Sequence, residues 1–292
     1  MTSTIASYIA VSQNLTRYQA MTAAEPAVKT ATAYYEANIS KVTSIQDFVG
    51  DYRLLSYALN AFGLGDQINA KALITKVLEG GVSNSDSLAN TLSDTRWKAF
   101  ATAFDFAGQG ASSVSTSSAV SATTADYVEQ QLESDQGAED VGVQLALYFQ
   151  RVAPTVTSEY GVLADKNLLQ AVQTIFGLSP QSSATDIDSQ AQALSNLMPV
   201  SDLQDSTKLQ QLTDRFAAMY DLTYGPNSGA TTSLTVSGNS TSAPSGASSV
   251  LASVIASNSD SIGKSLLAFT GASTPMFSST LMTSIQRFRL GG

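Results

Sequence analysis

The residue patterns in this chain that could carry chemistry are few and incomplete. Ser261 and Lys264 have the spacing of the Ser-x-x-Lys nucleophile motif of penicillin-recognising enzymes. That motif works together with Ser-Asp-Asn and Lys-Thr-Gly partners, and the sequence contains neither of them. A serine-rich helix surface accounts for this pair better than a nucleophile does.

Acidic residues offer the next possibility, as metal ligands. Asp186 and Asp188 are two residues apart, so on a helix their side chains would point to different faces, and helix capping is the expected role. The acidic run between residues 133 and 140 lacks the oxygen spacing and glycine turn of a calcium loop. We expect this run to be a solvated helix face, and we predict no metal or cofactor.

Whole classes of catalytic site are excluded by composition, because the 292-residue chain contains no histidine and no cysteine. Ser-His-Asp triads, thiol nucleophiles, histidine acid-base pairs and zinc-thiolate sites therefore cannot form. An enzyme would have to use carboxylates, Lys, Tyr or Ser alone.

Aromatic side chains at helical spacing form a more prominent set, for which core packing is the expected role and a groove for a partner is the alternative. The set comprises Trp97, Phe100, Phe104, Phe106, Phe216, Tyr220 and Tyr224. Tyr34 and Tyr148 occupy matching positions and could form a seam or an interaction surface. Phe288 and Leu290 belong to an amphipathic C-terminus that could dock on its own domain or on a partner.

The elements that must position these residues are repeated. Residues 25–64 recur at 139–178 with a constant offset of 114 and 11 identities in 40 positions, where roughly 2 or 3 are expected from composition. The identities follow helical spacing and end in the same Phe-Gly-Leu. The sequence therefore predicts an all-α fold of two pseudo-repeated multi-helix units packed together, with a C-terminal helical tail.

Helix signals support this reading. Asp51 and Asp165 each precede an apolar pattern with i, i+3, i+4 spacing that ends at a glycine, Gly63 or Gly177. Further helices are expected over residues 70–78, 93–106, 186–197 and 209–222. A β-leaning stretch at 231–236 could form a short hairpin.

Two stretches rich in Ser, Thr and Gly divide the chain, and both are expected to be flexible because small polar residues bury little surface. The predicted organisation is repeat one at 1–107, a linker at 108–124, repeat two at 125–224, a flexible linker at 225–249 and a helical tail at 250–292.

Composition also limits the partners. The net charge is −9 and charged residues are only 13% of the chain, so a nucleic-acid partner is not expected, because such surfaces need clustered Lys and Arg. No stretch approaches the apolar length of a membrane span. The N-terminus lacks the pattern of a cleavable signal peptide. We expect a protein that either stays in the cytoplasm or is exported without a cleaved signal.

Several short motifs together resemble an alphaproteobacterial family known only as domain of unknown function 1217. They are Glu25–Lys29, Tyr34-Tyr35, residues 38–44, residues 51–55, Lys76–Gly81 and residues 93–101. The resemblance covers most of 25–106 and, more faintly, 139–224. It implies an all-α fold, a role associated with the flagellum, whose genes often neighbour those of the family, and no catalytic residues.

These observations favour a non-enzymatic structural, assembly or interaction protein with protein partners, and the resemblance implies that these partners are flagellar components. One alternative is an export-chaperone-like or regulatory adaptor that binds helices of a partner, which an open apolar groove would favour. The other is an enzyme independent of histidine and cysteine, which a pocket containing a carboxylate of shifted pKa would favour.

Overall fold

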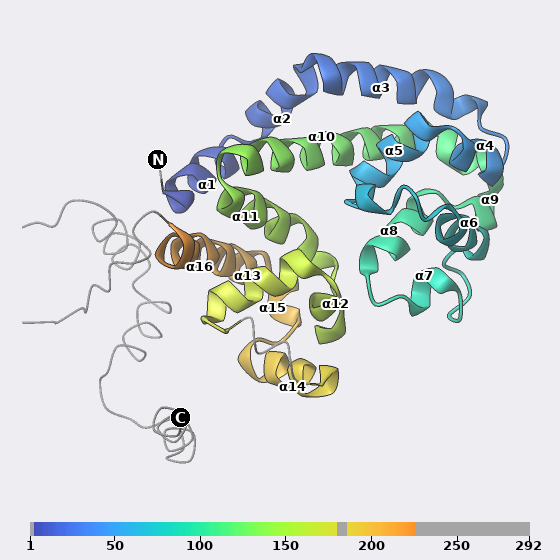
Figure 1. Cartoon of the computed structure of the whole chain (residues 1–292). Helices are drawn as coiled ribbons and strands as arrows, with labels where there is room; N and C mark the ends of the chain where they lie inside the picture. The colour runs from blue at the N-terminus through green and yellow to red at the C-terminus, as the bar shows by residue number, and fades with distance from the viewer. Residues whose placement is uncertain (1–2, 180–185, 226–292) are drawn as a thin grey trace, which may run out of the picture. The chain divides into compact units, whose positions relative to one another are not determined.

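A computed structural model describes residues 3–179 and 186–225, which lie in one compact unit, Met1–Thr232 (Figure 1). The fold is all-α, and the described residues contain no strand. The elements are α1 Thr4–Ser12, α2 Leu15–Ala24, α3 Pro26–Asn38, η1 Ile39–Lys41, α4 Ile45–Gly50, α5 Tyr52–Ala61, η2 Gly65–Gln67, α6 Lys71–Gly80, α7 Leu88–Thr91, α8 Thr95–Ala103, α9 Phe106–Gln109, η3 Gly110–Ser115, α10 Ser117–Glu139, α11 Val141–Val152, η4 Ala153–Thr155, α12 Glu159–Ala164, α13 Lys166–Phe176, α14 Ile187–Leu197, α15 Ser201–Gln204 and α16 Ser206–Tyr224.

Aspartates start many of these short helices. Asp51, Asp94, Asp140, Asp165 and Asp205 each accept backbone N–H hydrogen bonds in the first turn of α5, α8, α11, α13 and α16. A carboxylate at this position satisfies amides that have no partner within the helix and complements the helix dipole. Asp186 caps α14 in the same way, as the sequence predicted.

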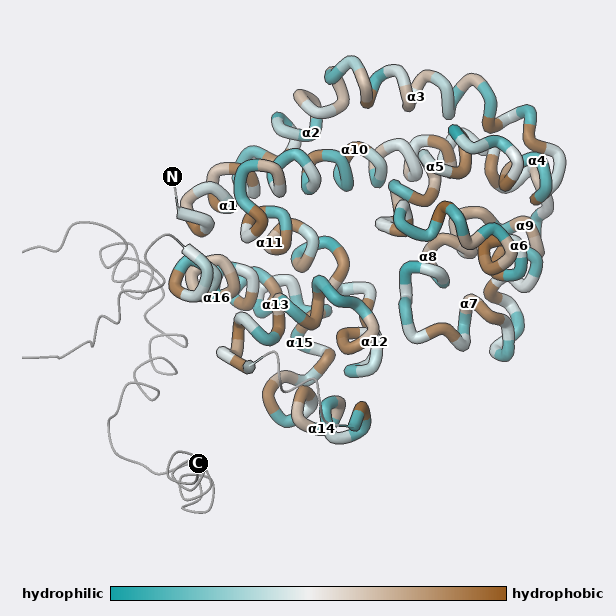
Figure 2. The backbone as a smooth tube through the Cα atoms, in the orientation of Figure 1, coloured by the Kyte–Doolittle hydropathy of each residue, from teal (hydrophilic) through white to brown (hydrophobic). Residues whose placement is uncertain are grey.

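Aromatic side chains fill the core of the N-terminal half. Phe48 lies against Phe104, and Phe100 packs on both Phe104 and Trp97. The prediction that the aromatic set packs in the core is confirmed for these residues and for Phe106 and Phe216, all of which are buried. It is wrong for Tyr224, which is exposed at the end of α16. Hydrophobic residues alternate with hydrophilic ones along the helices rather than forming long runs (Figure 2).

The prediction that residues 1–107 form one unit does not hold for helix α1. Helix α1 packs on α11 and α16 of the other half of the chain. The Asp221 carboxylate of α16 accepts the Thr4 and Ile5 amides at 2.8 and 3.2 Å. Asp221 lies 217 residues from Thr4, so the local sequence around α1 could not predict this contact.

The flexible linker predicted at 108–124 is also wrong, because this stretch is α9, η3 and the start of α10. Val114 is fully buried, and Thr116 caps α10 by accepting the Ala119 amide. Helix α10 packs along α5 on one side and α11 on the other, so tertiary contacts compensate for the weak helix propensity of Ser and Thr.

The repeated segment has the same local geometry in both places. Ser44 and Ser158 cap α4 and α12 with nearly identical backbone angles. Gly63 and Gly177 both adopt positive φ, at 68° and 64°. The larger prediction, of two whole repeated multi-helix units, is not confirmed.

The linker predicted at 225–249, the tail predicted at 250–292 and the hairpin predicted at 231–236 lie outside the described residues, apart from Gly225. Among the helices that the structure describes, none has the length and apolarity required to cross a membrane.

Candidate functional site

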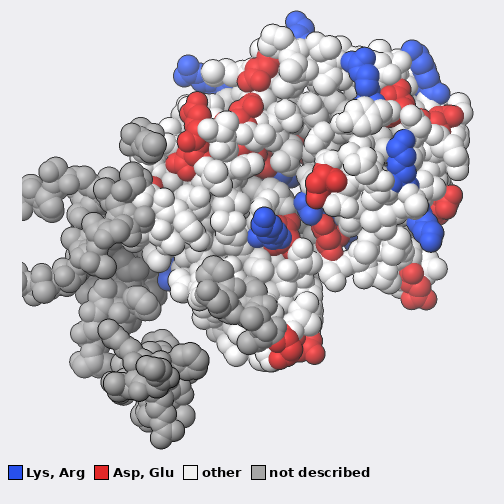
Figure 3. Space-filling view, viewed as in Figure 1, with Lys and Arg blue, Asp and Glu red and all other residues white. Residues whose placement is uncertain are grey.

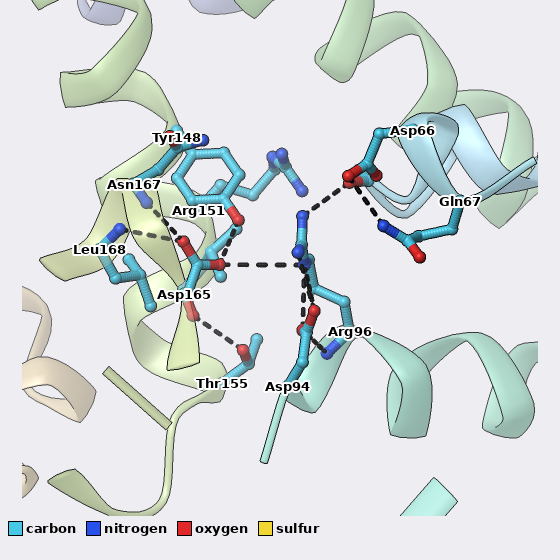
Figure 4. Close-up of polar contacts among 12 residues, drawn as sticks. Asp66, Gln67, Asp94, Arg96, Tyr148, Arg151, Thr155, Asp165, Asn167 and Leu168 are labelled. Atoms are coloured by element: carbon cyan, nitrogen blue, oxygen red, sulfur yellow. Dashed lines mark hydrogen bonds and ion pairs between the residues drawn. The ribbon is translucent and has the colours of Figure 1, made fainter. Parts of the chain in front are cut away.

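Buried and partly buried polar groups gather where the N-terminal half of the described chain, residues 3–115, meets the C-terminal half, residues 117–179 and 186–225 (Figure 4). We call this set the junction network. Its members come from the end of α5, the start of α8, helices α10 and α11, and the cap of α13; they are Gly63, Asp94, Arg96, Gln130, Glu133, Tyr148, Arg151 and Asp165.

Arg96 joins the halves at the first turn of α8. Its Nη2 lies 2.7 Å from Asp94 Oδ2, and its Nη1 donates to the Gly63 carbonyl at 2.7 Å. Its Nε lies 3.9 Å from Asp165 Oδ2 in the other half. Burial alone would lower the pKa of Arg96, but the hydrogen bonds and charges of the neighbouring acids outweigh burial and raise it. Arg96 is therefore a fixed cation.

Asp165 performs two tasks at once. Its Oδ1 accepts the Asn167 and Leu168 amides at 2.9 and 3.0 Å, which caps α13. Its Oδ2 accepts the Tyr148 hydroxyl in a short hydrogen bond. Burial, followed by the charge of Asp165, raises the pKa of Tyr148. The hydroxyl therefore stays protonated and acts as a structural donor.

Arg151 and Glu133 form a paired contact between α11 and α10. Nε lies 2.6 Å from Oε1 and Nη2 lies 2.8 Å from Oε2. Nη2 also donates to Gln130 Oε1 at 2.8 Å. Glu133 is only 1% exposed, so the prediction that this acidic run is a solvated face is wrong for its first member. Because α11 buries the Glu133 carboxylate, its charge is stable only when it is paired, and Arg151 of α11 supplies the partner.

An open groove of about 820 Å³ lies beside the network, and we call it the junction groove. Its walls come from α8, α9 and η3 of the N-terminal half and from the first turns of α10 in the C-terminal half. Thr155 and Thr157 of the C-terminal half complete the lining. Most of the lining side chains are Ser, Thr or Ala, so the surface is a mixture of hydroxyl and methyl groups.

Two charged groups in the groove lack a close partner. Among the residues that the structure describes, neither the Lys98 ammonium nor the Asp126 carboxylate makes a hydrogen bond or ion pair. Burial raises the pKa of Asp126, and the charge of Arg151 opposes that rise only in part. Within residues 3–179 and 186–225, no group of three acidic side chains is arranged to hold a metal ion.

The residues predicted as an interaction surface are separated. Tyr34 is half-buried and donates to Asp51 at 2.8 Å, with the Arg53 guanidinium 3.6 Å from its ring centroid. Tyr148 is 4% exposed, so its assignment to a partner surface is wrong, because α13 and the network cover it. Phe288 and Leu290 lie outside the described residues.

Sequence reasoning missed the site-forming residues Arg96, Arg151, Glu133 and Asp126. One usable signal was present, because Asp126, Gln130 and Glu133 follow i, i+4, i+7 spacing and share one face of α10. Their partners lie on other helices, at sequence separations that no local pattern reveals.

A family model described as "Protein of unknown function (DUF1217)" matches residues 61–209, a span that contains the whole junction network and groove. A crystal structure of a protein from Agrobacterium tumefaciens is similar to 76% of this chain and to 94% of its own, with 41% sequence identity and a TM-score of 0.70. No curated protein matches the sequence. On these findings the chain belongs to the DUF1217 family of proteins of unknown function.

Proposed function

We propose that this protein is a non-enzymatic helical scaffold that binds another protein along the junction groove. The observation that carries the proposal is that the charged side chains of the junction network are engaged in structural contacts. Arg96, Arg151 and Asp165 cap helices or join the halves, and groups committed in this way are poorly placed for proton transfer to a substrate.

The groove itself suits binding. It is open, it runs across both halves, and its hydroxyl and methyl walls offer hydrogen bonds and apolar contact without a deep enclosed pocket. Charged side chains are scattered among uncharged ones on the face shown in Figure 3. The groove itself is lined by three charged residues, Lys98, Asp105 and Asp126, so few charges lose water when a partner covers it.

The flagellum is the proposed setting, and this part rests on the resemblance to a family whose genes often neighbour flagellar genes. The partner would then be a flagellar component, and the protein would act in structure or assembly. The export-chaperone-like adaptor is the variant of this proposal in which the protein stays in the cytoplasm.

An enzyme is the second candidate, favoured by one observation. Asp126 lies in a groove with a pKa raised by burial, which is a property of general acids. The other charged side chains of the groove are Lys98 and Asp105, and Asp105 is already committed to the amide of Gly108, so a binding role accounts for the site more fully.

A photo-crosslinking experiment in the native host tests the proposal. A benzophenone amino acid would replace Ala122 in the groove or, as the control, Ala33 on the exposed side of α3. We expect position 122 alone to crosslink to an identified flagellar protein. Identical products from both positions would overturn the groove as the binding site.

Cell fractionation tests the setting separately. In wild-type and export-deficient cells, the tagged protein is followed in cytoplasm, basal bodies and culture supernatant. Export-dependent appearance in basal bodies or supernatant supports a structural role, whereas retention in the cytoplasm of both strains supports the adaptor. Crosslinks only to proteins with no flagellar role would overturn the flagellar setting.

A further inference from the structure

Four of the eight Ser and Thr hydroxyls that line the junction groove donate their protons to backbone carbonyls. Thr102 donates to the Lys98 carbonyl, Ser113 to the Gly110 carbonyl and Thr155 to the Val152 carbonyl, each at 2.8 Å. Thr116 donates to the Ser113 carbonyl at 3.3 Å. A hydroxyl has one proton and two lone pairs, so these four oxygens can offer a ligand only acceptor sites.

The carboxylates of the groove differ in what they have left to offer. Asp105 already accepts the Gly108 amide at 3.0 Å and the Gln109 side chain at 3.1 Å. Asp126 accepts no hydrogen bond among the described residues. It is therefore the strongest acceptor in the groove that remains available.

The nearest cation does not neutralise Asp126 directly. Arg151 directs its Nε and Nη2 to Gln130 and Glu133, which lie one and two turns beyond Asp126 on the same face of α10. The Arg151 charge reaches Asp126 only through space. Asp126 therefore has no donor bound to it among the described residues.

We propose that the junction groove recognises an arginine side chain of a protein partner, with the Asp126 carboxylate and hydroxyl oxygens of the groove accepting its guanidinium protons. A guanidinium presents five donors in a planar fork and no acceptor. This is the complement of an unpaired carboxylate in a groove where half of the hydroxyl protons are already committed to the backbone.

Size and charge are consistent with a peptide-borne group. The groove, at about 820 Å³, exceeds the volume of one side chain and leaves room for the segment that presents it. The net charge of −9 would favour approach of a basic partner. Lys98 is the opposing group, because its ammonium lies in the same groove and would repel a cation.

The proposal rests on the proposed binding function, and titrations of the full chain test it separately from the identity of the partner. The probes are acetyl-Ala-Arg-Ala-amide, the same peptide with citrulline, which is nearly isosteric and uncharged, and spermidine as a free polyamine. Binding is followed by NMR chemical shifts and by calorimetry. We expect the arginine peptide to bind at least about tenfold more tightly than the citrulline peptide.

Three variants locate the effect. Asp126→Asn should weaken binding of the arginine peptide by about tenfold or more, Lys98→Ala should retain or tighten it, and Asp86→Asn, which alters an exposed carboxylate outside the groove, should leave it unchanged. Matching thermal transitions would show that Asp126→Asn is folded.

Equal affinity for the arginine and citrulline peptides, or unchanged binding by Asp126→Asn, would overturn the proposal. Binding of spermidine without the arginine peptide would also overturn it. If position 122 crosslinks to a flagellar protein and the arginine peptide does not bind, the proposed function survives and this inference fails. The reverse pair of results would leave this inference standing and remove the flagellar partner.

Discussion

The two copies of the repeated segment, residues 25–64 and 139–178, share the geometry of their helix caps and differ in their surroundings. In each copy a tyrosine hydroxyl donates to the aspartate 17 residues later, and that aspartate caps the next helix. Tyr34 and Asp51 remain partly open to solvent, whereas Tyr148 and Asp165 are buried beside Arg96.

This difference shows that one sequence motif can have two energetic roles. In the first copy the Tyr-Asp pair fixes the start of a helix. In the second copy the same pair also braces the two halves, because α8 supplies Arg96 and α10 covers Arg151 with Glu133. Charged groups contribute far more in a buried network than at a surface.

The largest expected contrast follows from removing the capping aspartates. Asp165→Ala should lower the free energy of unfolding by about 3–5 kcal/mol, because it leaves two amides and the buried Tyr148 hydroxyl without their partner and removes the ion pair with Arg96, which keeps Asp94. Asp51→Ala should cost about 1 kcal/mol, as for an ordinary cap. Urea denaturation of the full chain measures both, and equal losses would contradict the comparison.

Removing the tyrosine hydroxyls should give a smaller contrast of the same sign. Tyr148→Phe should cost about 1.5–3 kcal/mol, because a buried carboxylate loses a hydrogen bond. Tyr34→Phe should cost less than about 0.5 kcal/mol, because water can replace the lost donor at a half-exposed site. The same denaturation curves apply, and a larger loss for Tyr34→Phe would reverse the interpretation.

The two glycines that end the repeated segment give the next test. Substitution of either glycine by alanine should lower the free energy of unfolding by about 1 kcal/mol, because both glycines have positive φ. Gly63→Ala should cost more, because its Cβ would lie 3.3 Å from Gln130 Oε1 and 3.6 Å from Arg96 Nη1. Nothing lies within 4 Å of the corresponding point at Gly177. Equal melting-temperature shifts for the two variants would indicate that a Cβ at position 63 does not disturb the junction network.

The smallest effect concerns pH. Burial alone would raise the pKa of Asp51, but hydrogen bonds from the Leu54 amide, the Tyr34 hydroxyl and the Arg53 amide outweigh it and lower the pKa. A lowered folded-state pKa contributes stability above the unfolded value, near about 3.9, and that stability is lost as pH falls through the folded value.

The stability difference between the wild type and Asp51→Asn should therefore be constant near neutral pH and should shrink below about pH 4. Because this site is largely exposed, we expect a change of less than about 1 kcal/mol. A difference that grows on acidification would contradict the assigned direction.

Sequence reasoning predicted the helical class, the aspartate caps and the repeated segment, because each depends on local spacing. It failed at 108–124, where Ser and Thr composition suggested flexibility but burial of Val114 and packing of α10 against α5 and α11 impose helices. It also treated Glu133 as solvated, because its partner Arg151 lies on another helix. Asp126 could be placed on a helical face from sequence, whereas its lack of a partner is a property of the tertiary structure.

The central claim is that the second copy braces the two halves of the described chain while the first copy does not. Two double-mutant cycles test it, one combining Arg96→Met with Asp165→Asn and the other combining Arg53→Met with Asp51→Asn. Unfolding would be followed by far-UV circular dichroism and by the fluorescence of Trp97, the single tryptophan, which is buried next to Arg96. We predict a coupling energy of at least about 1 kcal/mol for the first cycle and less than about 0.5 kcal/mol for the second. Additive effects in the first cycle, or equal coupling in both, would contradict the account.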